Sequence, residues 1–398
     1  AMEAEQLDSM QSLYQGKTTA DPMRICICVP SAHYDQLDFS AAVGDCLEER
    51  GHSTFRATEG DPRIVESDLV ILVGDARRFT QSVGILRCCG ENRPNVVLWQ
   101  LESLPPVKMS NKARRIGLAI ARCNRKNLPG PLSRAAQAVI PRCRDAQMLL
   151  RTALARSAGR ELAKANPSYA NVEPSILCHA MDRYYWFRRN YDPVWCDAVF
   201  ASTPPRVEFL NDMGVPAQYV PVGYHPIWGE QLDRKRDIDV LFFGDAINRT
   251  RRSALEQIRG QFAAAGVQFV CVTEPVYGRE RTELLNRARI VLDIMRTPWE
   301  MPVLRLLMCA SCGAMVVSNW TGEPAPFDTG HLAQVDTDEM AEAAVHYLKR
   351  EPERQAIAGA AQAFVTRELA MQRSLESILE TIGAERPRSA ELGGGRSR

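Results

Sequence analysis

The chain has 398 residues, 45% of them hydrophobic and 24% charged, so it is long enough for two domains that each bury a core. Its formal net charge of +1 excludes a strong overall field towards nucleic acid or an acidic membrane. Since it contains no secretion signal and no run of about 18 apolar residues, we expect a cytoplasmic protein with no transmembrane segment and no nucleic-acid partner.

The N-terminal half alternates predicted strands with predicted helices. Each strand is a nearly continuous apolar run, which predicts a parallel sheet covered on both faces. A first helix is expected over 39–50, and the region 107–170 is helical and Arg-rich without a strand signal. The predicted strands lie at 24–29, around Phe55, and at 67–75, 95–103, 197–202 and 217–224.

A polar segment with Pro and Gly, 225–236, has the composition of a linker. After it the alternation begins again, which predicts a second α/β domain with helices from about 251, over 338–348, and in one long run to about 382. The predicted strands of this half are 238–244, 267–272, 289–294 and 314–317.

The stretch FFGDAINRTRRSALEQI, 242–258, predicts an anion site. A strand ends at Gly244 and a helix begins near Arg251, so backbone amides at the helix N-terminus can bind a phosphate. Arg249, Arg251 and Arg252 add charge that suits a diphosphate. The alternative is a solvated, Arg-rich first helical turn. The stretch lacks the Gly-Lys-Ser/Thr tail of a Walker loop.

The cysteines give no metal prediction. Cys309 and Cys312 form a Cys-x-x-Cys pair, but no second pair of Cys or His accompanies it, so packing is the favoured interpretation. We therefore expect no metal site and thiols that remain reduced.

From about 195 to 365 the order of features resembles a family. CDAVFAS, GVPAQYVPVGYHPIW, VLFFGDAINRTRR, RARIVLDI, LRLLMCASCGAMVVSN and GEPAPFDTGHLAQVDTDEMAEAAVHYL together resemble GT-B glycosyltransferases of the "glycosyl transferases group 1" type, with spore-maturation-like members nearest. The resemblance implies an α/β fold with two Rossmann-like, doubly wound domains facing a central cleft. It also implies metal-independent transfer with retention at the anomeric carbon.

On that resemblance we expect four parts. They are an N-terminal acceptor domain at 22–226, a C-terminal nucleotide-sugar domain at 237–365, a helix at 366–382 that crosses back to the first domain, and a disordered tail at 383–398.

Such enzymes often carry Glu-x(7)-Glu before a Cys-Gly pair. Anchored on Cys312-Gly313, the first glutamate falls on Glu300, which the resemblance implies contacts the donor sugar. The second falls on Met308, which cannot accept the ribose hydrogen bonds, a loss of about 1.5–3 kcal/mol. Arg305 could reach a phosphate or extend to solvent, and the sequence leaves both open.

The resemblance implies a role for each of several residues. Glu300 and Arg252 are the expected catalytic residues. The expected donor-binding residues are Gly244, Asp245, Asn248, Arg249, Arg251, Arg252, Arg305, Gly313 and Thr321. The expected acceptor-side residues are Ser31, His33, Trp99, Glu102 and His179. Glu102 could equally be an exposed strand-end carboxylate, and a core role is favoured for His179.

The predicted activity is transfer of a sugar from a nucleotide-diphosphate donor, by hypothesis a UDP-sugar, to an unidentified acceptor. The acceptor could be a small molecule, a glycan or a peptide, and the nucleotide-sugar is a co-substrate, so no cofactor is expected. Two alternatives remain: a non-catalytic descendant that binds sugars or assists assembly, for which Met308 is the best argument, and, less favoured, a nucleotide-sugar epimerase.

Overall fold

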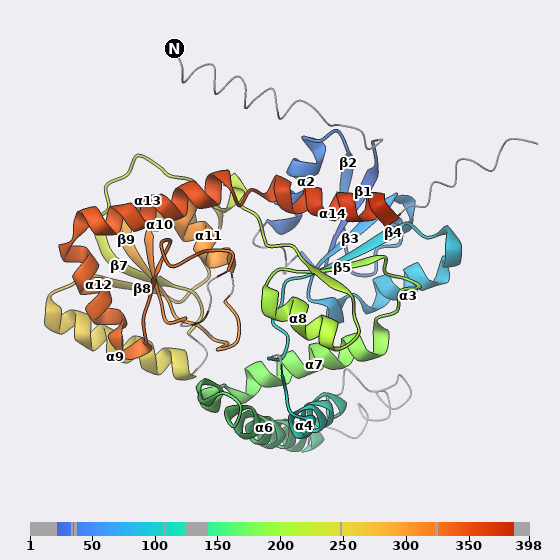
Figure 1. The fold of residues 1–398 in the computed structure, drawn as a ribbon, viewed down its shortest axis with the longest axis horizontal. Helices are drawn as coiled ribbons and strands as arrows, with labels where there is room; N and C mark the ends of the chain where they lie inside the picture. The colour runs from blue at the N-terminus through green and yellow to red at the C-terminus, as the bar shows by residue number, and fades with distance from the viewer. Residues whose placement is uncertain are drawn as a thin grey trace, which may run out of the picture.

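The computed structural model describes residues 22–32, 35, 38–106, 108–124, 142–246, 249–301, 303–320, 322 and 325–385. Within these residues the chain forms two α/β units that lie side by side, each built on its own parallel sheet (Figure 1). No helix of this part of the chain is both long and apolar enough to cross a membrane. The expected α/β class with two doubly wound units is confirmed.

The N-terminal sheet has six strands in the order β2-β1-β3-β4-β5-β6, and every neighbouring pair is parallel. All six residues of β3 are buried, as its unbroken apolar run predicts. The strands are β1 (Arg24–Val29), β2 (Ser53–Thr58), β3 (Leu69–Gly74), β4 (Asn95–Gln100), β5 (Ala198–Ala201) and β6 (Ala217–Tyr219). The helices α2 (Phe39–Glu48), α3 (Thr80–Cys88) and α8 (Pro204–Asp212) connect them.

Three further helices form a layer at one end of this unit, between β4 and β5 in sequence (Figure 1). They are α4 (Asn111–Arg122), α6 (Arg142–Ala163) and α7 (Pro174–Asn190), and all three pack against one another. Ser110 caps α4 by accepting a hydrogen bond from the backbone N–H of Ala113. The absence of a strand signal over 107–170 agrees with the residues described there.

The C-terminal sheet has five parallel strands in the order β11-β10-β9-β7-β8. Its strands are β7 (Ile238–Phe243), β8 (Phe269–Val272), β9 (Ala288–Asp293), β10 (Met315–Ser318) and β11 (Ala333–Gln334). Its helices are α9 (Arg249–Ala265), α10 (Gly278–Arg287), α11 (Val303–Ser311) and α12 (Met340–Lys349). The strand order reverses between β7 and β9, and in doubly wound sheets ligands bind beside such a switch point.

The long helix expected to run to about 382 is two helices, α13 (Glu351–Arg367) and α14 (Met371–Glu385). Backbone hydrogen bonds to Tyr224 stabilise the break. The N–H of Tyr224 donates to the carbonyl of Leu369 at 2.6 Å, and the carbonyl of Tyr224 accepts from the N–H of Met371 at 2.9 Å. A Cβ on Gly223 would lie 2.4 Å from the Cα of Met371, so only glycine permits this approach.

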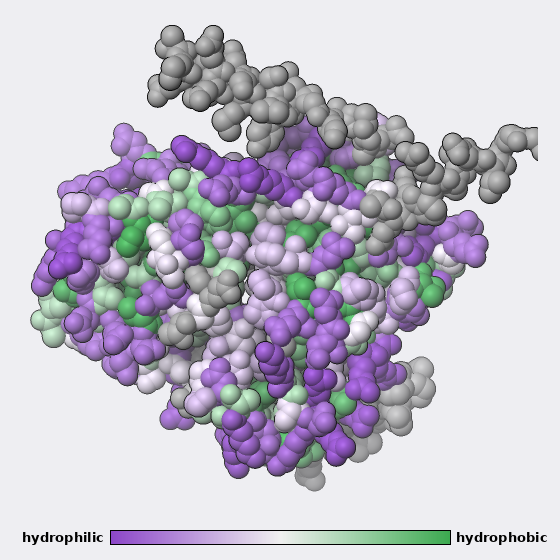
Figure 2. All heavy atoms as spheres, in the orientation of Figure 1, coloured by the Kyte–Doolittle hydropathy of each residue, from purple (hydrophilic) through white to green (hydrophobic). Residues whose placement is uncertain are grey.

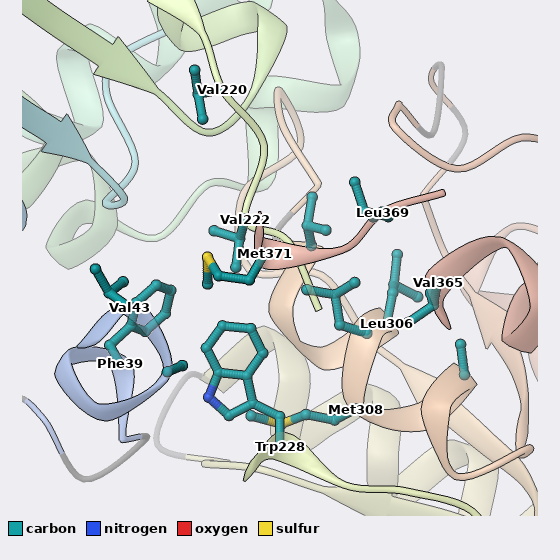
Figure 3. Close-up of a cluster of buried hydrophobic side chains, with 14 of the residues drawn as sticks. Phe39, Val43, Val220, Val222, Trp228, Leu306, Met308, Val365, Leu369 and Met371 are labelled. Carbon is teal, nitrogen blue, oxygen red and sulfur yellow. The ribbon is translucent and has the colours of Figure 1, made fainter. Parts of the chain in front are cut away.

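Beyond the break, α14 leaves the C-terminal unit and lies along α2 of the N-terminal unit (Figure 1). Arg50 forms an ion pair with Glu376 there. A single buried apolar cluster spans the junction and includes Phe39, Trp228 and Met308 (Figure 3). The rings of Phe39 and Trp228 are 5.0 Å apart. The two units therefore share part of one core.

Candidate active site

A pocket of about 370 Å³ lies between the two units. On the C-terminal side it begins at the ends of β7 and β9, which is the switch point of that sheet. On the N-terminal side it begins at the end of β4 and at α7. Its lining residues are Glu102, Ser103, Ile176, His179, Arg183, Phe243, Arg251, Asp293, Met295, Arg296, Thr297, Leu304, Arg305 and Met308. A space of this size and position suits a small-molecule ligand.

Arginines dominate the polar part of the C-terminal wall. Arg305 pairs with Asp293 at 2.6 Å, and its guanidinium lies 5.5 Å from the ring centre of Phe243. Arg296 is half-exposed and pairs with Asp245 at 3.2 Å. These two side chains place positive charge beside the loop that follows β7, where a bound anion would also meet the first turn of α9.

Arg251 is buried and braces the same loop. Its Nη1 donates to the carbonyl of Asp245 at 3.0 Å, and its Nη2 donates to the carbonyl of Ile294. Burial, followed by the nearby guanidinium groups of Arg305 and Arg296, lowers the pKa of Arg251 to about 10. The group remains charged at neutral pH and joins the loops after β7 and β9.

Gly244 shapes the anion-facing loop. Its φ of +132° belongs to a region that side chains with a Cβ rarely adopt, and a Cβ there would lie 2.8 Å from the Nη2 of Arg305. The backbone conformation therefore favours the strand-end glycine expected from the sequence, and a larger residue would also displace this guanidinium.

Both carboxylates that line the pocket are already paired. Asp293 accepts from Arg305, and its second oxygen lies 3.4 Å from the hydroxyl of Ser318. Glu102 pairs with Arg183 at 3.1 Å, and Arg183 also lies 3.2 Å from Asp75. Glu102 and Arg183 therefore form one connected polar group in the N-terminal wall.

His179 lines the pocket from α7. Partial burial, and then the guanidinium groups of Arg77, Arg183 and Arg151, lower its pKa to about 4. The imidazole is therefore neutral at pH 7 and can donate or accept a hydrogen bond. The core role favoured from the sequence is wrong, because the ring is open to the pocket.

Most of the remaining wall is apolar. Ile176 contributes from the N-terminal side, and Phe243, Met295, Leu304 and Met308 contribute from the C-terminal side. Met308 is 3% exposed and also belongs to the cluster that joins the units. Met308, on α11, therefore packs in the core and also forms part of the pocket wall.

Glu300 does not line the pocket in this structure. Its two carboxylate oxygens accept from Nε and Nη2 of Arg206 at 2.7 and 3.0 Å, and Thr203 lies 3.4 Å away. Glu300 is 1% exposed and Arg206 is 4% exposed. The sugar contact expected of Glu300 is therefore replaced here by a buried ion pair between the two units.

The residue before it strengthens the same junction. Trp299 follows β9 in the C-terminal unit, but its side chain belongs to the buried cluster of the N-terminal unit. Its indole N–H donates to the carbonyl of Leu104 at 2.8 Å, and its ring meets Tyr169 edge to face at 5.8 Å. We call Trp299, Glu300 and Arg206 the cross-domain clamp.

Several other expected site residues lie elsewhere. Trp99 is fully buried and donates to the carbonyl of Val220 at 3.0 Å, so it is a core residue and not an acceptor contact. Gly313 terminates α11 with φ +68°, at the end of the helix remote from Arg305. Arg252 is exposed and donates to the carbonyl of Ala246, outside the pocket lining.

The other predictions are not settled by these contacts. Arg249 is exposed on the first turn of α9, and Ser31 follows β1 by two residues; neither lines the pocket. His33, Asn248 and Thr321 lie outside the described residues. Among the residues the structure describes, no three His, Cys, Asp or Glu side chains gather as a metal site.

Sequence reasoning missed Asp293, Arg296 and Arg183. A signal existed for the first, because Asp293 is the last residue of a buried strand whose other members are mostly apolar. Polar residues at the carboxyl end of a parallel strand face the ligand side of the sheet.

Comparison with known proteins finds a family match that covers the C-terminal unit. Residues 230–380 match a family described as "Glycosyl transferase-like". No curated protein matches the chain. Anabaena HepE in complex with UDP-glucose aligns at 11% identity, covering 91% of this chain and 100% of that one, with a TM-score of 0.48.

Sucrose-phosphate synthase from Thermosynechococcus elongatus aligns at 10% identity, covering 91% of this chain and 99% of that one, with a TM-score of 0.49. Since both TM-scores are below 0.5, we draw no functional conclusion from these two likenesses. The family match rests on sequence and spans the whole C-terminal sheet together with α11, α12 and α13. The C-terminal unit is therefore the part of the chain that is similar to the glycosyl transferase-like family.

Proposed function

We propose that the chain is a glycosyltransferase that binds a nucleotide-diphosphate sugar in the pocket between its two units. The observation that carries the proposal is the position of Arg305 and Arg296 at the switch point of a glycosyl transferase-like domain. Guanidinium groups form paired, charge-assisted hydrogen bonds with phosphate oxygens. The loop at Gly244 and the start of α9 would complete the diphosphate site.

In the proposed reaction, the bond between the anomeric carbon and the β-phosphate oxygen breaks, and its electron pair remains on the diphosphate. Arg305 and Arg296 stabilise that charge, which makes a metal ion unnecessary. An acceptor hydroxyl attacks the anomeric carbon from the N-terminal wall, where Glu102 and neutral His179 would orient it. Its proton passes to the departing diphosphate oxygen. Retention at the anomeric carbon, which the family resemblance implies, and UDP as the leaving nucleotide, which is a hypothesis, are both part of the proposal.

A second candidate is a non-catalytic descendant that binds sugars or nucleotides. The ion pair between Glu300 and Arg206 favours it, because the carboxylate expected to hold the donor sugar is occupied. The pairing of Glu300 leaves Arg305 and Arg296 available to a diphosphate. This candidate therefore still predicts nucleotide binding, but no sugar transfer.

The test is thermal unfolding with UDP, GDP, ADP and dTDP and with their sugar conjugates. Ligand at a hundred times its dissociation constant adds about 2.7 kcal/mol of stability. Arg296→Gln should weaken nucleotide binding about tenfold or more, since it removes the proposed charged hydrogen bond from Arg296, a half-exposed side chain, to the diphosphate. Arg279→Gln is the matched control, because Arg279 is exposed on α10 and does not line the pocket.

A nucleotide-specific shift that Arg296→Gln reduces and Arg279→Gln preserves would support the donor site. Release of free nucleotide from the matching sugar conjugate would then separate the transferase from the non-catalytic descendant. If no nucleotide or conjugate raised the unfolding temperature, the proposed donor site would be wrong.

A further inference from the structure

The net charge of +1 conceals a strong segregation of charge. Residues 108–164 hold 14 of the 49 Lys and Arg residues but only two of the 48 Asp and Glu residues. This segment therefore carries a formal charge of +12, and the rest of the chain carries −11. A basic block of this size within a near-neutral chain indicates an interaction with a polyanionic partner.

In the structure, the described part of this segment is α4, α6 and their flanks. Two of its arginines are neutralised by the N-terminal unit, because Arg114 pairs with Asp212 and Arg151 with Asp182. The exposed basic residues that remain are Lys108, Lys112, Arg115, Arg122, Arg156, Arg160 and Lys164. We call these seven, together with the three residues named below, the α4–α6 surface.

Most of these seven charges are not balanced locally. Lys112 and Lys164 share one carboxylate, that of Glu161. Arg115, Arg156 and Arg160 form no ion pair within the described residues. Hydrophilic side chains predominate at the end of the molecule where α4 and α6 lie, with a few hydrophobic ones among them (Figures 1 and 2).

The same surface exposes a run of large apolar side chains. Met148, Leu149 and Leu150 follow one another on α6 and are 61%, 68% and 51% exposed. They are three of the seven large hydrophobic side chains found exposed in the described part of the chain. Consecutive exposed aliphatic residues beside unpaired arginines are unusual on a surface that meets only water.

We propose that the α4–α6 surface binds an anionic lipid bilayer. Basic side chains near such a surface gain from its negative potential, and long aliphatic side chains gain by entering the boundary between head groups and acyl chains. A nucleic acid would use the charge but has no place for Met148, Leu149 and Leu150, because its backbone offers phosphates and not an apolar layer. The combination therefore favours the membrane over a nucleic acid.

This placement connects to the pocket through one helix. α7 packs against both α4 and α6, and it also supplies Ile176, His179 and Arg183 to the N-terminal wall. A molecule anchored in the bilayer would thus meet the protein beside the wall proposed for the acceptor. The membrane proposal rests on charge and exposure alone, and it holds whether or not the pocket binds a nucleotide.

The experiment is flotation of the full chain with vesicles of phosphatidylcholine alone and of phosphatidylcholine with 30% phosphatidylglycerol, at about 0.1 M and 0.5 M salt, concentrations at which surface charge is moderately and strongly screened. Binding should require phosphatidylglycerol and should weaken at the higher salt. Each basic side chain near the surface strengthens binding about fivefold, so Arg115→Gln/Arg156→Gln/Arg160→Gln should lower the partition coefficient about 100-fold. Leu149→Ser should lower it about tenfold at either salt concentration.

The matched control is Arg56→Gln/Arg259→Gln/Arg367→Gln, which removes the same charge from exposed arginines on β2, α9 and α13. It should float like the wild type, and unfolding temperatures of all variants verify that each is folded. Absence of wild-type binding to the anionic vesicles would overturn the proposal, as would an equal loss in the control. Tighter binding to a 30-base-pair DNA duplex, with displacement from vesicles by that duplex, would also overturn it.

Discussion

Replacing Glu300 with Gln tests whether this side chain joins the two units or holds a donor sugar. The change removes one charge and keeps the shape, so Arg206 remains 4% exposed without its carboxylate partner. Arg206 would keep its bonds to the carbonyl of Leu101 and the hydroxyl of Ser202, but it would lose its counter-charge. A buried guanidinium left without a counter-charge is strongly unfavourable.

The magnitude follows from the burial of the pair. Removing one partner of a buried ion pair costs about 3–5 kcal/mol, and the amide of Gln can still hydrogen-bond, so we expect about 3 kcal/mol. For domains of this size each kcal/mol shifts the midpoint by about 2–4 °C, which gives a fall of roughly 6–12 °C. Differential scanning calorimetry without ligand measures it directly.

Two comparisons separate the ion pair from a general loss of charge. Glu283→Gln, which removes an exposed carboxylate paired with Arg279, should shift the midpoint by less than about 2 °C. Arg206→Met combined with Glu300→Leu should recover most of the stability lost in Glu300→Gln, since apolar replacement of a buried pair is often neutral. If Glu300→Gln unfolds within about 1 °C of the wild type, a fraction of the shift worked out above, the ion pair contributes nothing to stability. Glu300 would then again be a candidate for contact with the donor sugar.

Three further outcomes are expected. Gly244→Ala should destabilise the chain by about 1–3 kcal/mol, because a residue with a Cβ is strained at φ +132°. It should also abolish nucleotide-induced stabilisation, because the added Cβ forces the guanidinium of Arg305 to move. An unchanged midpoint and affinity would show that the loop is not constrained. The wild type should bind UDP and 2′-deoxy-UDP within about threefold, since Met308 accepts no hydrogen bond and both pocket carboxylates are paired; a calorimetric ratio above about tenfold would show that another group recognises the 2′-hydroxyl. His179 has a pKa of about 4 when folded and one near 6.5 when unfolded. The unfolded state therefore binds more protons between these values, and stability falls as the pH drops from 6.5 to 4. The unfolding midpoint of His179→Asn should fall less over that range, and a fall equal to that of the wild type would refute the assignment.

The sequence predicted the parts of the fold whose signal is local. β3 is a continuous apolar run and β7 is an apolar run interrupted only by Asp239, so their positions follow from neighbouring residues alone. The break between α13 and α14 has no such signal. The chain there has the composition of a continuous helix, and only the pairing of Leu369 and Met371 with Tyr224 interrupts it.

The site was predicted less well because its contacts are long-range. Glu300 and Arg206 are 94 residues apart, and neither position signals the other. Trp299 follows a strand of one unit but packs into the core of the other, which no periodicity indicates. By contrast, Gly244 was found because the end of a strand is visible in the sequence. The structure brings it against Arg305, for which the sequence had left a phosphate contact and solvent exposure both open.

The return of α14 to the first unit sets an order for folding during synthesis. Leu375, Ile378 and Ile382 of α14 belong to the same buried cluster as Phe39 and Val43 of α2. Gln372 hydrogen-bonds Glu49 across 323 residues of sequence. At translation rates of about 5–20 residues per second, the apolar face of α2 stays uncovered for on the order of half a minute after it leaves the ribosome. The N-terminal unit is synthesised first, but its core is completed only when α14 has been made. We expect truncation before residue 371 to leave the apolar face of α2 exposed to chaperones and to aggregation.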